Sequence, residues 1–485
     1  MSGVLINPLS GLVMVTAPAV EPHPAMVAPF VLLLLAIALL PFILKHHWEN
    51  HYAKVAIGLG LVTVAYYVVV LHNTPQMLLS LIEYVGFMAL IGSLYVIAGG
   101  IHIKMTGRSM PAVNTGLLAL GAVLANLIGT TGASMLLIRP FLQINKHRVA
   151  AYHVVFFIFL VSNIGGALTP IGDPPLFLGY LKGVPFFWLV QRLQVLLAWL
   201  LCVGVLLALF FVIDSSNFRR HKTDAVTLTS DRIELTGSHN FLWLFVIIAL
   251  VLAQKAEWLK GVEHWSALAS LGDALGWNAA KTAESFITLL TALLMIGTAV
   301  LSHKFANQGA LKENKFDFAP LREVGFLFVG IFATMVPALD LLEKHAADIG
   351  ITTVRQFYWG SGLLSAMLDN APTYLNFLTA AFGLQGLSLE NPAHVDLMLH
   401  LRDTQFVQVG AHVVDPHAAL YIVAVSLGSV FFGAVSYIGN GPNFMVKSIA
   451  ESAGVKCPSF FGYVVKYALP ILIPLFALVS WLFLR

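Results

Sequence analysis

The chain has 485 residues, of which 58% are hydrophobic and only 11% are charged, and its formal net charge is +3. Soluble globular domains carry about 25% charged residues, so this composition excludes a soluble protein and indicates one that is solvated by lipid. No basic cluster stands apart from the apolar segments, so nucleic acid is not an expected partner. Cys202 and Cys457 lie far apart in or beside apolar runs, which excludes a disulfide framework and a cysteine metal motif.

The apolar segments predict a polytopic membrane protein. The N-terminus lacks the basic residues that begin a secretory signal, so we expect it not to be cleaved. A hydrocarbon core about 30 Å thick needs about 20 apolar residues per helix. On this criterion, the segments expected to cross the membrane are 26–44, 55–71, 84–101, 149–181, 193–213, 241–252, 286–301, 324–339, 418–445 and 467–484.

Two further apolar stretches, Pro111–Ile138 and Phe357–Gly383, are long for one straight span and too short for two. Each has a polar centre, with the sequence GTTGAS at 129–134 and LDNAPT at 368–373. A re-entrant hairpin whose tip lies near the middle of the bilayer explains both features. The sequence therefore predicts two such hairpins.

The loop charges predict that the two hairpins enter the membrane from opposite sides. Basic residues flank the first stretch and place it on the cytoplasmic side under the positive-inside rule: Lys104, Arg108, Lys146 and Arg148. Acidic residues predominate around the second stretch and place it outside: Glu343, Asp348, Glu390, Asp396 and Asp415.

Matching sequences support an internal repeat. Val85–Gly99 resembles Val324–Ala338, and Gly166–Pro175 aligns with Gly433–Pro442. With the opposed loop charges, these matches predict an all-α fold of two inverted repeats, each with a hairpin and a broken helix. The expected parts are N-terminal scaffold helices (1–81), repeat 1 (82–182), scaffold helices with a linker (183–322), repeat 2 (323–448) and a C-terminal helix (449–485).

Prolines and glycines cause the predicted helix breaks. Thr169–Pro175 reads TPIGDPP, and its prolines cannot continue a helix because each lacks a backbone donor and clashes with the preceding turn. Asp173 before two prolines is typical of an N-cap residue. Ser436–Pro442, which reads SYIGNGP, repeats the break with softer residues.

Asp173 and Asp369 are expected to be the only carboxylates at hydrocarbon depth, while all other acidic residues lie in loops or at segment ends, including Asp214 and Asp340. A charge at the bilayer centre costs about 2.5–3.5 kcal/mol on insertion scales, which favours a functional role. The structural alternatives are a helix cap for Asp173 and a hairpin-turn residue for Asp369.

Hard oxygen donors surround these two carboxylates and suit a small hard cation such as sodium. Each hydroxyl alone has the alternative of bonding its own helix backbone, so the prediction rests on the cluster. Its members are Asn126, Thr130, Thr131, Ser134, Asn163, Thr169, Asn370, Thr373, Ser436 and Asn440.

The segments SNIGGALTPIGDPP (162–175) and SAMLDNAPT (365–373) resemble signature segments of the ion transporter superfamily, in particular those of NhaD-type sodium/proton antiporters. The resemblance implies scaffold helices that hold a homodimer and a mobile elevator domain of two hairpins and two broken helices. By position, it implies ion-binding roles for Asn163, Thr169, Asp173, Asp369, Asn370, Ser436 and Asn440. The two hairpin tips differ and only the second is acidic, which departs from the dicarboxylate symporter branch of this superfamily.

We therefore expect a multi-pass secondary transporter of the inner membrane that exchanges sodium or lithium for protons at Asp173 and Asp369, with no cofactor. The alternative is a sodium-coupled transporter for a carboxylate or an arsenite-like oxyanion, which two aspartates at depth disfavour. A third interpretation is an aspartyl intramembrane protease, with the two aspartates as its catalytic pair. It would explain neither the repeat nor the oxygen donors, so we do not expect an enzyme.

Overall fold

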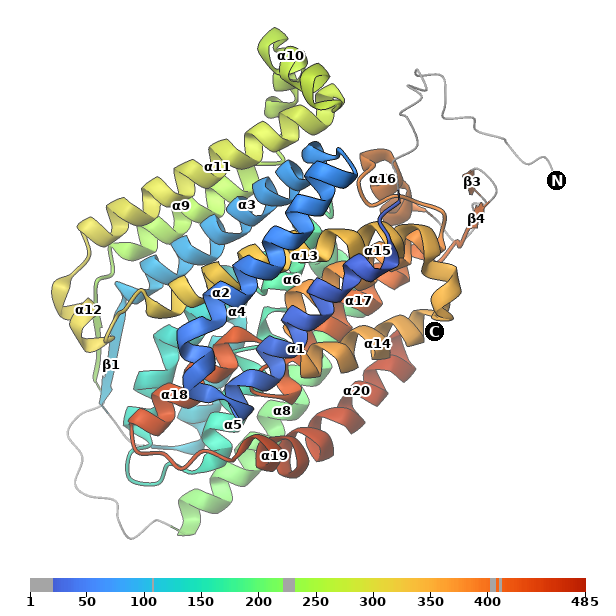
Figure 1. Cartoon of the computed structure of the whole chain (residues 1–485). Coiled ribbons are helices and arrows are strands. Elements are labelled where there is room, and N and C mark those ends of the chain that lie inside the picture. Colours follow the sequence, from blue (N-terminus) through green and yellow to red (C-terminus); the bar gives the residue numbers. More distant parts are fainter. Residues whose placement is uncertain (1–20, 107–108, 221–231, 402–406, 410–411) are drawn as a thin grey trace.

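The computed structural model describes residues 21–106, 109–220, 232–401, 407–409 and 412–485 (Figure 1). The N-terminus predicted to be uncleaved and the predicted cytoplasmic residue Arg108 lie outside the described residues. The described part of the chain is mostly helical, which confirms the predicted all-α class of polytopic membrane protein. Two short antiparallel ribbons in the loops are the additions to it: β1 (His102–Thr106) with β2 (Arg232–Thr236), and β3 (Val407–Val409) with β4 (His412–Val414).

The α-helices follow one another along the chain as α1 (Ala28–Ile43), α2 (Lys45–Ala65), α3 (Thr74–Gly99), α4 (Pro111–Ile144), α5 (Ala151–Leu160), α6 (Pro174–Leu181), α7 (Trp188–Gln191), α8 (Leu193–Arg220), α9 (Asn240–Ala253), α10 (Ser266–Leu275), α11 (Ala279–Lys304), α12 (Gln308–Glu313), α13 (Ala319–His345), α14 (Val354–Met367), α15 (Asn370–Leu384), α16 (Pro392–His400), α17 (Ala418–Phe432), α18 (Gly441–Ser452), α19 (Phe460–Tyr463) and α20 (Leu469–Phe483).

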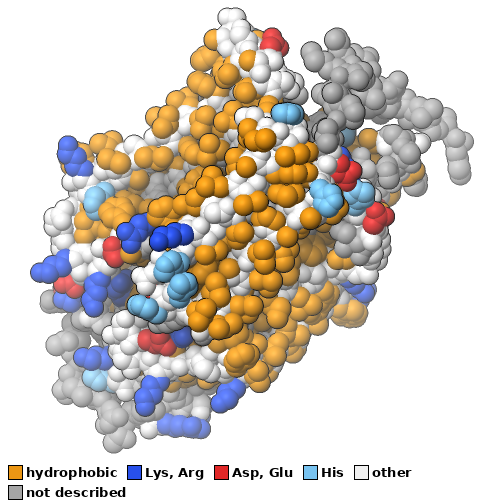
Figure 2. All heavy atoms as spheres, in the orientation of Figure 1, with side chains coloured by type: hydrophobic (Ala, Val, Ile, Leu, Met, Phe, Trp, Pro, Cys, Tyr) orange, Lys and Arg blue, Asp and Glu red, His pale blue; other side chains and the backbone are white. Residues whose placement is uncertain are grey.

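Within the described residues, 9 helices are long and apolar enough to cross a membrane. The predicted crossing at 241–252 corresponds to α9, whose 14 residues are fewer than a straight span needs. Figure 2 shows a broad hydrophobic face over α1 and α2, with Lys and Arg gathered toward the end where β1, α12 and α18 lie. Apolar side chains on the outside and charge at the end are what a lipid-embedded protein requires.

One acidic residue does not lie where the sequence predicted. α3 begins at Thr74, so Glu83 lies inside this apolar helix and not in a loop before it. The Nζ of Lys182 lies 2.7 Å from Glu83 Oε1 and pairs with its charge. The prediction that all acidic residues other than Asp173 and Asp369 lie in loops or at segment ends is therefore wrong for Glu83, because a tertiary ion pair lets the helix run past it.

The segment α4 folds back on itself at Gly129 and forms hairpin 1. Gly129 has φ 77° and ψ 153°, a backbone conformation that residues other than glycine rarely adopt. Asn114 Nδ2 donates to Asn145 Oδ1 at 2.7 Å although the two are 31 residues apart. A straight helix would separate them by about 46 Å. The two ends of α4 therefore lie together.

Helices α14 and α15 form hairpin 2. The rings of Phe357 on α14 and Phe377 on α15 lie 6.1 Å apart, so the two helices run back along each other. Asp369 is the N-cap residue of α15, and its side chain accepts from the Ala371 N–H. The turn between the helices is thus closed by a local cap.

Two interruptions, break 1 (161–173, between α5 and α6) and break 2 (433–440, between α17 and α18), share a backbone contact. In break 1, a Cβ on Gly172 would lie 2.1 Å from the carbonyl oxygen of Gly166. In break 2, a Cβ on Gly439 would lie 2.7 Å from the carbonyl oxygen of Gly433. Glycine is required at both places because backbone packs directly on backbone.

The hairpins and breaks pack together at the centre of the molecule. Helix α15 contacts α6 and α17, α14 contacts α17, and α4 contacts α18. Helices α3, α9 and α11 pack against one another along one edge (Figure 1). Helix α5 is almost wholly enclosed by apolar side chains. This packing brings four polar segments to one buried place.

Candidate ion-binding site

Asp173 is the centre of the candidate site. It occupies the N-cap position of α6, but its carboxylate accepts no hydrogen bond from that helix. Oδ1 instead accepts from Thr130 Oγ1 and from Asn440 Nδ2, both at 2.8 Å. Oδ2 accepts from Asn370 Nδ2 at 2.6 Å. Asp173 therefore lies at the N-cap position, as the helix-cap alternative predicts. Its side chain, however, accepts hydrogen bonds from three other segments and none from α6.

The three donors come from hairpin 1, hairpin 2 and break 2. Thr130 stands at the tip of hairpin 1, where its backbone N–H donates to the Gly172 carbonyl at 2.8 Å. Asn370 begins α15 at the tip of hairpin 2, and Asn440 ends break 2. All three donors are neutral, and Asp173 is 1% exposed. They orient the buried carboxylate without balancing the charge that it carries when ionised.

Two amide oxygens beside this cluster lack partners. Within the described residues, the Oδ1 atoms of Asn163 and Asn370 are buried and accept no hydrogen bond. A Cβ on Gly433 would lie 2.9 Å from Asn163 Oδ1 and 3.3 Å from Asn370 Nδ2, so both amides lie against the same glycine. Buried polar atoms nearly always have partners, and an unmade bond costs about 1–3 kcal/mol. These oxygens fit a bound cation.

Asp369 does not belong to the hydrogen-bond set of Asp173. Its Oδ1 accepts from the Ala371 N–H at 3.0 Å, which matches the hairpin-turn alternative in geometry. Thr373 Oγ1 donates to the Asp369 carbonyl at 2.9 Å. The Asp369 side chain is partly exposed, which leaves its second oxygen open to another partner.

The hydroxyls of Thr169 and Ser436 stabilise the breaks. Thr169 Oγ1 donates to the Asn126 carbonyl at 2.6 Å and accepts from the Gly172 N–H at 3.1 Å. Ser436 Oγ accepts from the Gly439 N–H at 3.1 Å, the equivalent bond in break 2. Thr131 is half-buried at the tip of hairpin 1. Thr169 and Ser436 hold the backbone around Asp173, and the hydrogen bonds to its carboxylate come from other side chains.

Two further predicted donors also bond within repeat 1. Ser134 and Ser162 share a hydrogen bond of 2.8 Å between hairpin 1 and the start of break 1. Asn126 donates to the Gly165 carbonyl at 2.6 Å and accepts from the Leu168 N–H at 2.9 Å. Both therefore attach hairpin 1 to break 1.

Sequence reasoning missed Asn443. Its Oδ1 accepts from Asn163 Nδ2 at 2.7 Å, and its Nδ2 donates at 2.8 Å to the carbonyls of Gly433 and Ser436. It fixes the orientation of Asn163 and hence of the unpartnered oxygen. A signal for it is present in the sequence, because Asn443 directly follows Pro442 in the first turn of α18.

A second missed cluster surrounds Asp214 on α8. Its carboxylate accepts from Arg148 Nη2 at 2.8 Å, Tyr152 Oη at 2.6 Å and Asn114 Nδ2 at 2.9 Å. His153 Nε2 lies 3.2 Å away. The cluster joins the base of hairpin 1 to α8. No local sequence pattern predicted this cluster, because Arg148 and Asp214 are 66 residues apart.

The comparison with protein families gives one finding. A family model described as "Putative citrate transport" matches residues 21–484, nearly the whole chain. No curated protein matches the chain.

Proposed function

The chain belongs to the family described as "Putative citrate transport", and from this premise we propose that it is a sodium/proton antiporter of the inner membrane whose exchanging group is Asp173. The family and the apolar helices support a multi-pass membrane transporter. The exchange of sodium, or lithium, for protons is our proposal for what this transporter does.

The observation that carries the proposal is the buried carboxylate of Asp173 with neutral donors only. An ionised carboxylate in this setting lacks a balancing charge, and ionisable groups at such depth mark ion pathways. A sodium ion or a proton can each neutralise it, and only one can do so at a time. That competition is the basis of exchange. The unpartnered oxygens of Asn163 and Asn370 supply further ligands of the kind that sodium prefers.

The packing around Asp173 favours a small ion over an organic anion at this position. Gly172 and Gly166 leave no space for a Cβ between their backbones, and neither do Gly439 and Gly433. A citrate-sized molecule would have to separate these contacts. A dehydrated cation needs only the oxygen atoms already present.

We further propose that residues 82–182 and 323–448 are inverted repeats, with hairpins 1 and 2 re-entrant from opposite sides. The equivalent glycine contacts and the equivalent bonds of Thr169 and Ser436 support this assignment. In this proposal the hairpins and broken helices move as an elevator domain within a homodimer. Asp369, at the tip of hairpin 2, is a second carrier of the sodium and proton charge. Thr131 and Thr373 belong to the same ion-binding set.

The family description favours a second candidate, a sodium-coupled carboxylate transporter. In that case sodium occupies the Asp173 cluster and the carboxylate, or an arsenite-like oxyanion, binds beside it.

Proteoliposomes containing the purified chain and a trapped pH-sensitive dye separate these candidates. We expect a preformed acidic interior to be relieved by added sodium or lithium and not by potassium. Asp173→Asn should abolish the response. Sodium-driven uptake of labelled citrate, with no sodium-driven proton movement, would overturn the antiport proposal in favour of the second candidate.

A further inference from the structure

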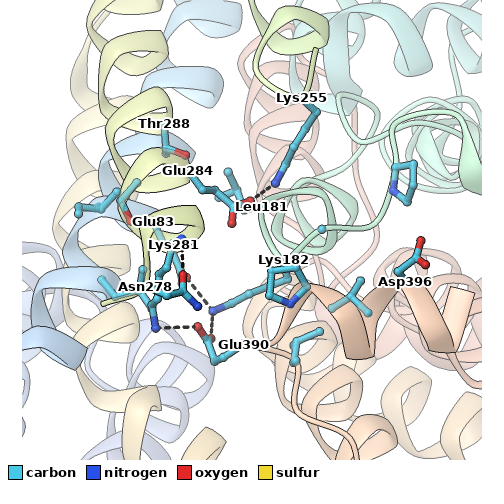
Figure 3. A pocket seen from close by; sticks show the side chains of 18 of the residues that line it. Glu83, Leu181, Lys182, Lys255, Asn278, Lys281, Glu284, Thr288, Glu390 and Asp396 are labelled. Atoms are coloured by element: carbon cyan, nitrogen blue, oxygen red, sulfur yellow. Dashed lines mark hydrogen bonds and ion pairs between the residues drawn. The ribbon is translucent and has the colours of Figure 1, made fainter. Parts of the chain in front are cut away.

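A cavity of about 290 Å³ lies at the opposite end of α6 from Asp173 (Figure 3). Helix α6 has 8 residues between Asp173, its N-cap, and Lys182, its C-cap, so its length is about 12 Å. The charged side chains that line the cavity come from several helices: Glu83, Lys182, Lys255, Lys281, Glu284, Glu390 and Asp396.

Lys182 forms ion pairs with two of these side chains. Its Nζ lies 2.7 Å from Glu83 Oε1 and also contacts Glu390. Lys281 Nζ lies 3.5 Å from the other oxygen of Glu390. The Lys182 side chain is only 7% exposed and that of Glu83 14%, so their pair is screened weakly by water. In Figure 3 these four side chains form one continuous chain of contacts.

The chain of ion pairs joins two groups of helices. Glu83 is on α3 and Lys281 is on α11, which pack against each other. Lys182 ends α6, and Glu390 precedes α16. The residue after Lys182, Gly183, lies against Val395 of α16. The pairs therefore connect α6 and α16 with α3 and α11.

The lysines of this cavity are not free to hold an anionic substrate. Lys182 and Lys281 face carboxylates, as described, and Lys255 contacts Glu284. The Lys255–Glu284 pair lies between the end of α9 and α11, inside one helix group. The ion pair itself does not bridge the two groups, and Lys255 also lies over the Tyr180 ring of α6, with its Nζ 6.0 Å from the ring centre.

We propose that Lys182 is a positioning residue: its ion pair with Glu83 locks α6, and with it Asp173, against α3, and Glu390 links Lys182 to Lys281 of α11. The pairs that cross between the two helix groups separate in each transport cycle. The proposal rests on the proposed elevator movement of the segments that carry Asp173. A rigid helix only two turns long transmits a displacement at Lys182 directly to Asp173. A lock of this kind stabilises one conformation and holds the other as a minor population.

The test measures the distance between α11 and α16 with spin labels. Ala279→Cys on α11 and Ala393→Cys on α16 are exposed labelling positions. The buried Cys202 can remain, and the partly exposed Cys457 is changed to serine. The lock is removed by changing all four members to glutamine (Glu83→Gln, Lys182→Gln, Lys281→Gln and Glu390→Gln), which removes two charges of each sign and leaves no isolated buried charge. The matched control is Lys255→Gln with Glu284→Gln.

We expect one dominant distance in the unmodified background and in the control. The lock variant should populate a second, longer distance that rises from under about 10% to at least a third of the molecules, a change of a few fold in a two-state equilibrium. Lys182→Arg, with its partners intact, should keep the single distance. Should the lock variant fold poorly, Glu390→Gln removes one partner of Lys182 and the partner of Lys281, at a side chain that is 32% exposed, and should give an intermediate increase.

Identical distances in the lock variants and the control would overturn the proposal. The measurement needs no transported ion, so a failure of sodium/proton exchange leaves its outcome readable. A second readout is transport itself. The lock variant should change the maximal rate of exchange more than threefold. The order of preference among sodium, lithium and potassium should stay unchanged. A changed order of preference would mean that Lys182 acts in the ion site and not as a lock.

Discussion

The hydroxyl of Thr130 donates to Asp173 Oδ1 from the tip of hairpin 1. Removing this hydroxyl tests one hydrogen bond of the site. A hydrogen bond to a charged group contributes about 1.5–3 kcal/mol, which corresponds to about a 10- to 150-fold change in affinity. We expect Thr130→Ala to raise the sodium concentration for half-maximal exchange by at least about tenfold. Thr115→Ala is the control, because its hydroxyl donates to the Pro111 carbonyl in the same hairpin, away from the site. Equal effects of the two substitutions would contradict a role for Thr130 at the site.

Asparagine variants distinguish the roles of Asp173 and Asp369. Asn is as good an N-cap as Asp, so Asp369→Asn should keep the start of α15, where the side chain accepts from the Ala371 N–H. We expect both Asp173→Asn and Asp369→Asn to abolish exchange while the proteins elute as folded species in size-exclusion chromatography. Normal exchange by Asp369→Asn, with loss only in Asp173→Asn, would restrict Asp369 to its capping role.

At the scale of elements, break 1 depends on backbone contact. A Cβ on Gly172 would lie 2.1 Å from the Gly166 carbonyl oxygen, whereas nothing lies within 4 Å of a Cβ on Gly441. Overpacking of this kind costs about 1–3 kcal/mol. Gly172→Ala should therefore lower the melting temperature in detergent and reduce exchange, and Gly441→Ala should leave the melting temperature unchanged. A Gly172→Ala protein as stable as the unmodified chain would show that break 1 can widen.

The ion pairs before α16 have a defined pH range. Burial opposes ionisation of Glu390, but Lys182 and Lys281 outweigh it and hold the pKa of Glu390 below its usual value. A carboxylate with a lowered pKa keeps its pairing above its ordinary pKa of about 4.3 and loses it only as the pH falls further. In a Glu83→Gln background, which removes the titration of Glu83, the distribution of distances between labels on α11 and α16 should thus be the same at pH 8.5 and pH 5.5. An increase in a longer component at pH 5.5 would contradict this pairing.

At the scale of the whole molecule, the opposed orientation of the repeats is open to labelling. Arg220 at the end of α8 and Asp396 on α16 are both exposed. We expect a cysteine at position 220 to react with an impermeant reagent only from the cytoplasmic side, and one at position 396 only from outside. Reaction from the same side would refute the inverted repeat.

The sequence alone determined the class of the protein and where its helices bend. Long hydrophobic segments predict helices because lipid offers no hydrogen-bond partners, so the backbone must satisfy its own polar groups. Proline and glycine act within a turn of their own position, so the breaks at 169–175 and 436–442 were predictable. Thr130, Asn370 and Asn440 were proposed near Asp173, but their individual bonds to its carboxylate were not.

Only the tertiary structure decided which side chains meet. Asp173 and Asn440 are 267 residues apart, and Asn163 and Asn443 are 280 apart, so no local pattern links them. The same holds for Glu83, which the sequence left outside its helix because the pairing Lys182 is 99 residues away. Burial makes a charge costly wherever it stands, and only the folded packing determines whether a partner, a cap or a bound ion offsets that cost.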